Sequence, residues 1–471
     1  MISKNADTPR LTVELHILMT DKEQRKAFYR VLDLNLRFGA LGEEQGRFLG
    51  QDKYVPDLHS ESGTDIVGAL REAIEFSAGE AGYLFSGMRG SGKTTELLRM
   101  QSEMAAEGEF FVLYTDARDH FNLVARVEIG DFLLTLCAAL AETVAANDQL
   151  GTDFAKRGIW SRFIDTLFAE VELKEMSGEV SWALAPGVNA KIAGKAALRH
   201  NPGLKEQIQR KLRERSESIA TQADVFFDEV AAYVRERTGR SRVLLLVDSL
   251  EHLRGTTRAE SLDVYESLAT LFTRHATELQ PRSMSLVYSI PPYLTAISQG
   301  FAAFFGGGRV FPLAMVHIFH REPGRRTVDD GLILMREVVA RRFPQWDRFF
   351  AEASLKRLAA SSGGDLRDFF RLLRACLTSS DQSHFPYDDL MLSYAEATLR
   401  EDFRFLSNED LAWLVKVEET RQIQLPSLKD LPQLAALLDG KAMLNYRNGD
   451  DWYDVHPLLR DRVRQHAAAA P

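Results

Sequence analysis

The segment Gly87-Met-Arg-Gly-Ser-Gly-Lys-Thr94 stands between the apolar run Tyr83-Leu84-Phe85 and the helical pattern TTELLRMQSEMAA. It matches the phosphate-binding loop G-x-x-x-x-G-K-[ST] in the strand-loop-helix context that this motif requires. Glycines let backbone N–H groups curl around phosphates, Lys93 is expected to reach their β and γ oxygens, and Thr94 offers a hydroxyl to Mg²⁺. A glycine-rich turn without a ligand is the alternative. The residues predicted to line the loop are Gly87, Met88, Arg89, Gly90, Ser91, Gly92, Lys93, Thr94 and Thr95.

Four more apolar runs follow the loop and alternate with helical patterns. They are FFVLYTD (110–116), VLLLVD (243–248), SLVYSI (285–290) and RVFPLAM (309–315). Runs that are apolar on both faces and alternate with helices indicate a parallel sheet between two layers of helices. We therefore predict an α/β fold, a three-layer P-loop NTPase core with a parallel sheet. Helical patterns without strands after about residue 325 predict a helical lid, and two helical patterns followed by a hairpin and a terminal helix predict a winged-helix domain.

Length and composition limit the class of protein. The 471 residues are about three times the length of a typical domain, so two to four domains are expected. A composition of 45% hydrophobic and 27% charged residues excludes a collagen-like or disordered chain, and the net charge of -9 disfavours avid nonspecific nucleic-acid binding. Cys137 and Cys376 lie on apolar helical stretches and are expected to be core residues in a reducing compartment. Without a signal-like start or an uncharged run of about 18 residues, we expect a cytoplasmic protein with no membrane partner.

The chain divides by pattern into four predicted domains. An insertion at about 120–240 interrupts the core; it contains a hairpin-like stretch at 179–198 and a helix pattern that starts at Asn201-Pro202 and continues to Gly239. We interpret that pattern as an amphipathic helix packed on the core, in preference to a partner-binding arm. The predicted domains are an entry segment (1–60) with a helix at 21–41, the ATPase core (61–324), a helical lid (325–400) and a winged helix (401–471) with a hairpin at Asn448-Gly449.

Two acidic residues follow the strand pattern VLLLVD. Asp248 ends the strand, where open α/β sheets bind their ligands, so it is the predicted Mg²⁺ partner; a strand-terminal cap is the alternative. Hydrolysis also needs a carboxylate that orients or deprotonates the attacking water. The residue after Asp248 is Ser249, so Glu251 is the best local candidate, with a surface or capping role as the alternative.

With these motifs the chain resembles the additional-strand, catalytic-glutamate branch of P-loop NTPases, and within it the AAA+ and STAND ATPases. Asp248-Ser-Leu-Glu251 resembles the D-G-L-D segment of NACHT-type STAND proteins, whereas most AAA+ proteins place the glutamate directly after the aspartate. The resemblance implies that Ser289 is a sensor-1 residue, although a plain strand-end serine fits equally. Gly364-Asp-Leu-Arg367 resembles a G-x-x-R sensor-2 element and implies that Arg367 approaches the γ-phosphate; an ordinary surface arginine is the alternative.

The resemblance spans about residues 50–468 outside the insertion, and it also extends to a bacterial group of AAA-type ATPases of largely undefined role. His456-Pro-Leu-Leu-Arg460 is similar to the M-H-D-L-L-R-E stretch of the STAND winged helix, which implies that His456 contacts the β-phosphate of ADP. Pro457 replaces the aspartate of that motif, and a core or surface histidine is the alternative. Tyr54 and Val55 resemble the segment that wraps adenine in relatives.

Two functions remain open from the sequence. The first is a slow, regulatory ATPase switch that binds ATP, ADP and Mg²⁺, acts through partner proteins or a homo-oligomer, and is inferred at family level to serve bacterial antiviral defence. The second is a DNA-associated AAA+ loader that uses the winged helix. Residues 401–471 carry nine Lys or Arg against twelve Asp or Glu, which disfavours the loader. Candidates for an arginine finger are Arg309, Arg321, Arg325 and Arg326, and nothing in the sequence selects among them.

Overall fold

The chain forms two compact units. The computed structural model describes residues 20–34, 37–38, 48–60, 65–170, 216–254, 258–297, 300–322, 324–378 and 384–469. One unit, here called the helical unit, comprises Met1–Leu58, Met315–Glu419 and Asp454–Pro471. The other, the sheet unit, comprises His59–Ala314 and Thr420–Tyr453. The division into four domains drawn from the sequence stays a prediction.

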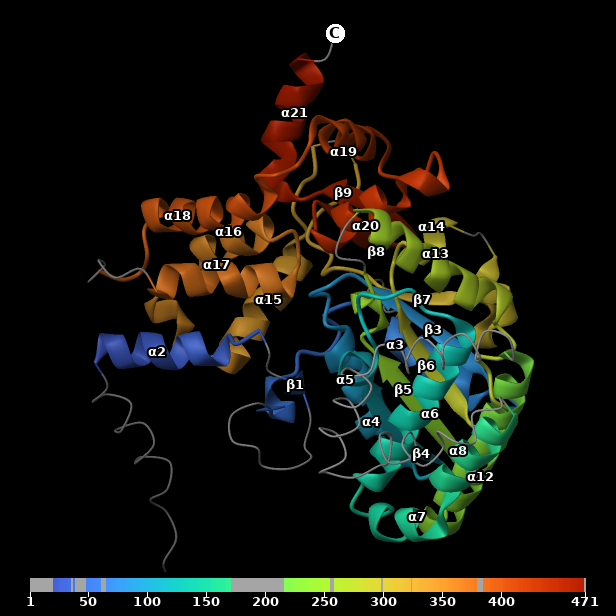
Figure 1. Cartoon of the computed structure of the whole chain (residues 1–471). Coiled ribbons are helices and arrows are strands. Elements are labelled where there is room, and N and C mark those ends of the chain that lie inside the picture. The colour runs from blue at the N-terminus through green and yellow to red at the C-terminus, as the bar shows by residue number, and fades with distance from the viewer. Residues whose placement is uncertain are drawn as a thin grey trace, which may run out of the picture. The chain divides into compact units, whose positions relative to one another are not determined.

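Five strands form the sheet of the sheet unit, in the order β4-β5-β6-β3-β7 (Figure 1). All neighbouring strands are parallel, as predicted. Strand β6 lies between β3, which leads into the phosphate loop, and β5, which ends in Asp248. An additional strand therefore separates the two strands that carry the predicted site. The strands are β3 Gly82–Gly87, β4 Phe110–Asp116, β5 Arg242–Asp248, β6 Ser285–Ile290 and β7 Val310–Leu313.

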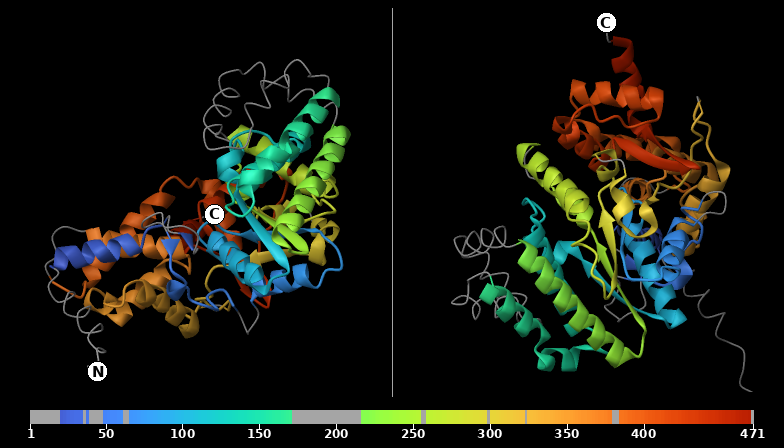
Figure 2. Two further views of the ribbon diagram at one scale, coloured as in Figure 1. Left: turned by 90° about the horizontal axis from the view of Figure 1, so that it is seen from below. Right: turned by 90° about the vertical axis from the view of Figure 1, so that its right-hand side faces the viewer.

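Helices cover both faces of this sheet, and the right-hand view of Figure 2 shows green helices on one side and blue helices on the other. Helices α3 (Ile66–Glu75) and α4 (Lys93–Glu107) pack on one face, and α6 (Ile129–Ala145) and α12 (Ser216–Thr238) pack on the other. Apolar side chains such as Phe85 and Met100 are fully buried between α3, α4 and the strands. The predicted three-layer α/β fold is confirmed. Shorter helices of this unit are α5 Ala117–His120, α7 Gly151–Arg157, α8 Ile159–Glu170, α13 Arg258–Arg274 and α14 Leu294–Ile297.

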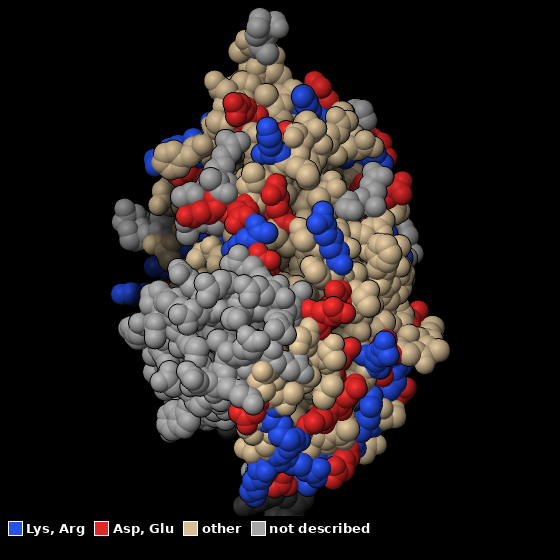
Figure 3. All heavy atoms as spheres, turned by 45° about the vertical axis from the view of Figure 1, so that its right-hand side comes forward, with Lys and Arg blue, Asp and Glu red and all other residues tan. Residues whose placement is uncertain are grey.

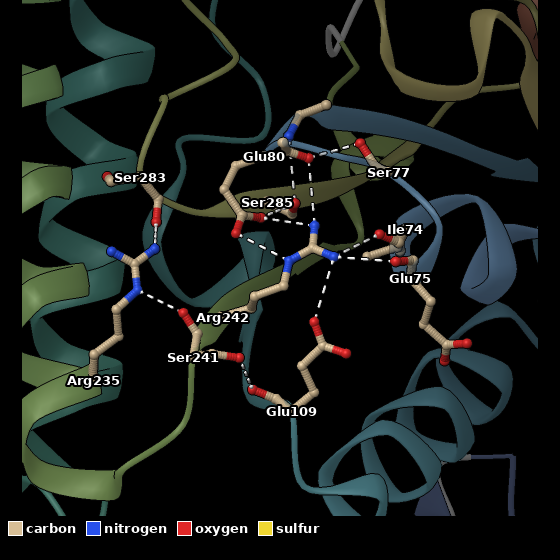
Figure 4. Close-up of polar contacts among 12 residues, drawn as sticks. Ile74, Glu75, Ser77, Glu80, Glu109, Arg235, Ser241, Arg242, Ser283 and Ser285 are labelled. Carbon is tan, nitrogen blue, oxygen red and sulfur yellow. Dashed lines mark hydrogen bonds and ion pairs between the residues drawn. The ribbon is translucent and has the colours of Figure 1, made fainter.

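Arg242, the first residue of β5, ties together the amino-terminal edge of the sheet (Figure 4). Its guanidinium pairs with the Glu80 carboxylate at 3.1 Å and donates to the carbonyl oxygens of Ile74 and Glu75, where α3 ends. Ser285, the first residue of β6, donates its hydroxyl to the same Glu80. A cation at the end of a helix offsets the partial negative charge of the last carbonyls. This cluster therefore holds two strands and a helix at the edge opposite Asp248.

Part of the predicted insertion is described. Helix α12 ends at Thr238, and Gly239 follows with a φ of 70°. Its buried apolar positions, each at most 2% exposed, include Ile219, Phe226, Val230 and Tyr233. Because α12 contacts β4 and β5 of the sheet as well as α6 and α8, the prediction of an amphipathic helix packed on the core is confirmed for residues 216–238. The predicted hairpin at 179–198 and the helix start at Asn201-Pro202 lie outside the described residues.

Residues 420–453 contribute a helix and a hairpin to the sheet unit. Helix α20 (Leu431–Asp439) packs on α13. Strands β8 (Met443–Asn448) and β9 (Asp450–Val455) pair in a two-stranded sheet, and Gly449 turns between them with a φ of 83°. Inside the hairpin, the rings of Tyr446 and Trp452 stack with centroids 4.6 Å apart. The hairpin predicted at Asn448-Gly449 is confirmed.

The helical unit contains the helices predicted for the lid. They are α15 Asp329–Arg342, α16 Glu352–Ser361, α17 Leu366–Thr378 and α18 Asp389–Arg400. Helix α2 (Asp21–Val31) lies beside α17, as Figure 1 shows, and Phe28 stacks on Phe343 with centroids 4.4 Å apart. This unit also holds the short parallel strands β1 (Arg37–Phe38) and β2 (Phe48–Leu49).

The helix predicted over 21–41 was too long, because α2 ends at Val31. Leu32 leaves the helical backbone with φ -93° and ψ 16°. The Arg342 side chain donates to the Val31 carbonyl at 3.3 Å, and Arg374 donates to the Leu32 carbonyl at 3.4 Å. The last carbonyl groups of α2 are thus bonded by side chains from α15 and α17, so the helix does not need to continue in order to satisfy them.

Helices α19 (Asn408–Thr420) and α21 (Arg460–Ala469) complete the helical unit. The order of α19, α20, hairpin and α21 agrees with the order of elements predicted for residues 401–471. Cys137 and Cys376 are buried and free, as expected. None of the described helices combines the length and the apolar character needed to cross a bilayer.

Candidate functional site

The phosphate loop folds as its sequence predicts, from the end of β3 into the first turn of α4. Gly92 precedes α4 with a φ of 98°, a backbone conformation that residues other than glycine rarely adopt. A Cβ atom on Gly87 would lie 2.9 Å from the Leu313 carbonyl oxygen and 3.1 Å from Lys93 Cγ. Ser91 is fully buried and donates its hydroxyl to the Met88 carbonyl at 2.9 Å. The loop is therefore a tight cradle that leaves no room for larger residues at these positions.

Lys93 lies inside this cradle, 5% exposed. Its ammonium donates to the carbonyl oxygens of Gly87 at 2.7 Å and Met88 at 2.9 Å. The same nitrogen lies 2.8 Å from Oε1 of Glu251. The structure thus brings together the predicted phosphate-binding lysine and the predicted catalytic glutamate.

Thr94 and Asp248 meet where β5 ends. The Thr94 hydroxyl donates to Oδ2 of Asp248 at 2.7 Å. The Tyr114 hydroxyl donates to the same oxygen at 2.8 Å, and the backbone N–H of Ser249 donates to Oδ1 at 2.7 Å. Mg²⁺ is usually held by one or two such oxygens together with water and substrate phosphates, so this hydroxyl and carboxylate fit the predicted ion.

Ser249 has a backbone conformation that is uncommon for its residue type. Its φ is 70° and its ψ 17°, in the left-handed region, and it is 2% exposed. A residue held in this region costs on the order of 1 kcal/mol, and such residues gather at functional sites. The turn at Ser249 directs the chain into η3 (Leu250–His252), which carries Glu251.

Glu251 is 6% exposed and both of its carboxylate oxygens are bonded. Oε1 pairs with Lys93, and Oε2 accepts the hydroxyl of Ser289 at 2.9 Å. Ser289 is fully buried near the end of β6. The predicted sensor-1 position therefore contacts the glutamate in this structure.

Burial and charge set the protonation states at this edge of the sheet. Burial acts to raise the pKa of Glu251, but the charge and hydrogen bond of Lys93, together with smaller contributions from His252 and the backbone, lower it overall, so the carboxylate is ionised. The pKa of Asp248 is raised, first by burial and then by the charge of Glu251, while the Thr94 and Tyr114 hydroxyls act in the opposite direction. Burial lowers the pKa of His252 to about 4, so this ring is neutral at pH 7.

Several residues near the loop were not predicted from the sequence. Tyr114 lies on β4, and only the pairing of β4 with β5 places its hydroxyl on Asp248. From the hairpin of residues 420–453, the backbone N–H of Asn445 contacts the Met88 sulfur at 3.2 Å. Burial raises the pKa of Asp439, at the end of α20, to about 6, while the charges of Arg89 and Arg254 act to lower it. No local sequence signal places Asn445 or Asp439 near the loop.

The other predicted site residues belong to the helical unit. Val55 is 4% exposed, and the Tyr54 carbonyl accepts a bond from Arg341. Arg367 lies half-buried near the start of α17. His456 is fully buried; its Nδ1 accepts the Leu458 N–H at 3.2 Å. The roles of Tyr54, Val55, Arg367 and His456 at a nucleotide stay predictions.

The arginine-finger candidates differ in their surroundings. Arg325 is buried and pairs with Asp454 at 2.6 Å and with Glu418 at 2.9 Å, so its guanidinium is occupied within its own chain. Arg309 lies over the Phe311 ring at 4.6 Å. Arg326 is exposed and Arg321 half-buried. The geometry thus disfavours Arg325 for a role on a second molecule.

Comparisons with known proteins give remote similarities. No family model and no curated protein sequence matches the chain. Among solved structures, a Walker-type ATPase of Pyrococcus abyssi is 12% identical, with 92% of this chain and 99% of that chain covered and a TM-score of 0.39. Cdc6p from Pyrobaculum aerophilum is 11% identical, with 88% and 98% covered and a TM-score of 0.35.

The strand order and the loop geometry identify the fold without these similarities. The strand before the loop and the strand that ends in Asp248 are separated by β6, and Thr94, Asp248, Glu251 and Lys93 converge at their carboxyl ends. That is the edge at which open parallel sheets bind ligands. The sheet unit has the α/β fold of P-loop NTPases.

Proposed function

We propose that the chain binds Mg-ATP and hydrolyses it to ADP and phosphate. The observation that carries the proposal is the buried set of Lys93, Glu251 and Ser289 next to the Thr94–Asp248 pair. Backbone N–H groups of the loop and the Lys93 ammonium bind the phosphates, and Glu251 accepts the proton of the attacking water. Thr94 and Asp248 would hold Mg²⁺, which would supply positive charge beside the phosphates when bound.

Lys93→Met tests this proposal. The change removes the charge that binds phosphate, so ATP affinity and turnover should both be lost. Because Lys93 is buried against Glu251, the single variant leaves an unpaired buried carboxylate and should also be less stable. Lys93→Met/Glu251→Gln removes both charges and serves as the folded control. Calorimetric titration with ATP, GTP and ADP and a phosphate-release assay give the readouts; wild-type affinity in either folded variant would refute the proposal.

We further propose that hydrolysis operates a slow regulatory switch of the STAND or AAA+ type. In this model ADP favours a closed state, ATP favours an open state, and the open state binds partner proteins or further copies of the chain. Support comes from the resemblance of the motifs at Asp248, Arg367 and His456. A role in bacterial antiviral defence is part of the same proposal. Mass measurement of the nucleotide-free, ADP and ATP-analogue states tests the switch, since an unchanged mass without partner recruitment would contradict it.

A DNA-associated loader with a winged helix is the second candidate. The acidic balance of residues 401–471 disfavours it. On the face that Figure 3 shows, Lys and Arg side chains lie interspersed with Asp and Glu and form no continuous basic stripe. Titration of a labelled duplex at two salt concentrations, with and without ATP, separates the candidates. Salt-dependent, ATP-dependent binding would favour the loader.

A further inference from the structure

The Lys93 ammonium uses its three donors on three oxygens. Two are carbonyl oxygens of the loop itself, from Gly87 and Met88, and the third is Oε1 of Glu251. An ammonium has no more than three N–H donors. Lys93 must therefore give up at least one of these partners before it can bond to a phosphate oxygen. Glu251 is the one partner of the three that carries a charge.

The two oxygens of Glu251 have different kinds of partner. Oε1 pairs with the far end of a long lysine side chain, whereas Oε2 accepts a bond from Ser289, whose short side chain is fixed to the middle strand of the sheet. All three side chains are at most 6% exposed. If Lys93 moves to a phosphate, Oε1 is freed while Oε2 stays anchored.

We propose that Glu251 is the counter-ion of Lys93 in the nucleotide-free protein, that the incoming phosphate displaces it, and that Ser289 then holds the released carboxylate in place. The substrate itself thus frees the base. In the hydrolytic step the water oxygen bonds to the γ-phosphorus, the bond from that phosphorus to the β,γ-bridging oxygen breaks, and ADP leaves with the electron pair. The water proton passes to Oε1 of Glu251. This inference rests on the proposed ATPase function and adds regulation to it.

The exchange of partners has a cost that can be measured without hydrolysis. If the phosphate displaces Glu251, every nucleotide that binds Lys93 breaks the buried ion pair, so the pair weakens the binding of ADP as well as ATP. Glu251→Gln keeps the shape of the side chain and removes its charge. We expect this variant to bind ADP roughly tenfold more tightly than wild type, because its bond to Lys93 is weaker and is broken more easily. A glutamate that acted only on water at the γ-phosphate would leave ADP affinity unchanged.

Ser289→Ala tests the anchoring half of the proposal. Loss of the hydroxyl leaves the ion pair intact but lets the released carboxylate move, so kcat should fall roughly tenfold while KM and ADP affinity stay near wild type. Ser289→Thr restores a hydroxyl and should recover most of the turnover. Ser285→Ala is the matched control, because Ser285 is also fully buried on β6 and donates to a glutamate at the opposite edge of the sheet. It should lower stability and leave kcat unchanged.

The outcomes separate this inference from the proposed function. ADP titration and steady-state turnover are measured on wild type, Glu251→Gln, Ser289→Ala, Ser289→Thr and Ser285→Ala, each checked for folding by circular dichroism. Wild type that binds no nucleotide, or binds it without turnover, contradicts the ATPase proposal. If wild type is active but Glu251→Gln binds ADP no more tightly than wild type, Glu251 is not the counter-ion that nucleotide displaces. If wild type is active and Ser289→Ala keeps the wild-type kcat, Ser289 does not hold the released carboxylate in place.

Discussion

Asp248 accepts hydrogen bonds from two hydroxyl groups and one backbone N–H, and this arrangement fixes its carboxylate beside Thr94. Asp248→Asn keeps the size of the side chain but removes the charge that would hold Mg²⁺. We expect Mg²⁺ to raise the ATP affinity of wild type at least tenfold over EDTA, and the variant to lose most of this gain. Titration of both proteins in Mg²⁺ and in EDTA checks the expectation. A variant with the full Mg²⁺ effect would show that the ion is held elsewhere.

Asp439 should make stability depend on pH. Its pKa is raised by burial from 3.8 to about 6, so the folded state holds the proton more tightly than the unfolded state. Ionisation therefore costs stability as the pH rises from about 4 to 6, and the cost persists above pH 6. Asp439→Asn removes the ionising group and should be more stable than wild type by about 1 to 2 kcal/mol at pH 7.5.

Urea unfolding at pH 7.5, 6.0 and 4.5 measures this effect. The advantage of Asp439→Asn should shrink towards pH 4.5, where the wild-type carboxyl is protonated when folded. The exposed Asp148, changed to Asn, is the control. An advantage of equal size at all three pH values would exclude titration of Asp439 as its cause.

At the scale of the element, the edge of the sheet opposite the site is expected to stabilise the fold and to take no part in nucleotide binding. Arg242 joins β5 to the end of α3 and to Glu80, which is bonded to β6 (Figure 4). Arg242→Met leaves the Glu80 carboxylate without its cation and should lower the free energy of unfolding by about 3 kcal/mol. ATP affinity of the folded variant should match wild type. Denaturant unfolding and ATP titration check both parts, and a loss of affinity in the folded variant would contradict the separation of the two edges.

The elements that the sequence predicts well are those with a local cause. The five strands are continuous apolar runs, and the loop has glycines where its backbone requires them, so both follow from short segments of sequence. The end of α2 could not be predicted from its own segment of sequence, because it depends on Arg342 and Arg374, more than 300 residues away. The Ser289–Glu251 bond likewise needs the neighbouring positions of β5 and β6, which come from the strand order and not from either strand alone.

At the scale of the whole molecule, the sheet unit is built from two separate parts of the chain. Residues 420–453 add α20, which packs on α13 and buries Leu434, Leu437 and Leu438. A chain that ends at Glu419 should therefore destabilise the sheet unit by roughly 5 kcal/mol, since these side chains and their partners lose their apolar contacts. A chain that ends at Tyr453 keeps this segment and should retain the stability of the sheet unit.

Thermal unfolding and ATP titration of the two truncated chains test this expectation. The chain that ends at Tyr453 is the control for loss of α21 and of the Asp454 pair with Arg325. Equal melting temperatures and affinities for the two chains would show that α20 and the hairpin fold independently of the sheet.

Oxidation of Met88 can report when the hairpin of residues 420–453 separates from the phosphate loop. Met88 is 2% exposed, and its sulfur accepts the N–H of Asn445 from the hairpin of residues 420–453. Peroxide converts an accessible thioether to the sulfoxide, so the sulfur is protected for as long as the hairpin stays on the loop. Met100 and Met104 are fully buried under the sheet and are internal references for global unfolding. Peptide mass spectrometry measures the oxidation rates of the three methionines with and without nucleotide. Faster oxidation of Met88 than of Met100 and Met104 would give the rate at which the hairpin separates from the loop without global unfolding.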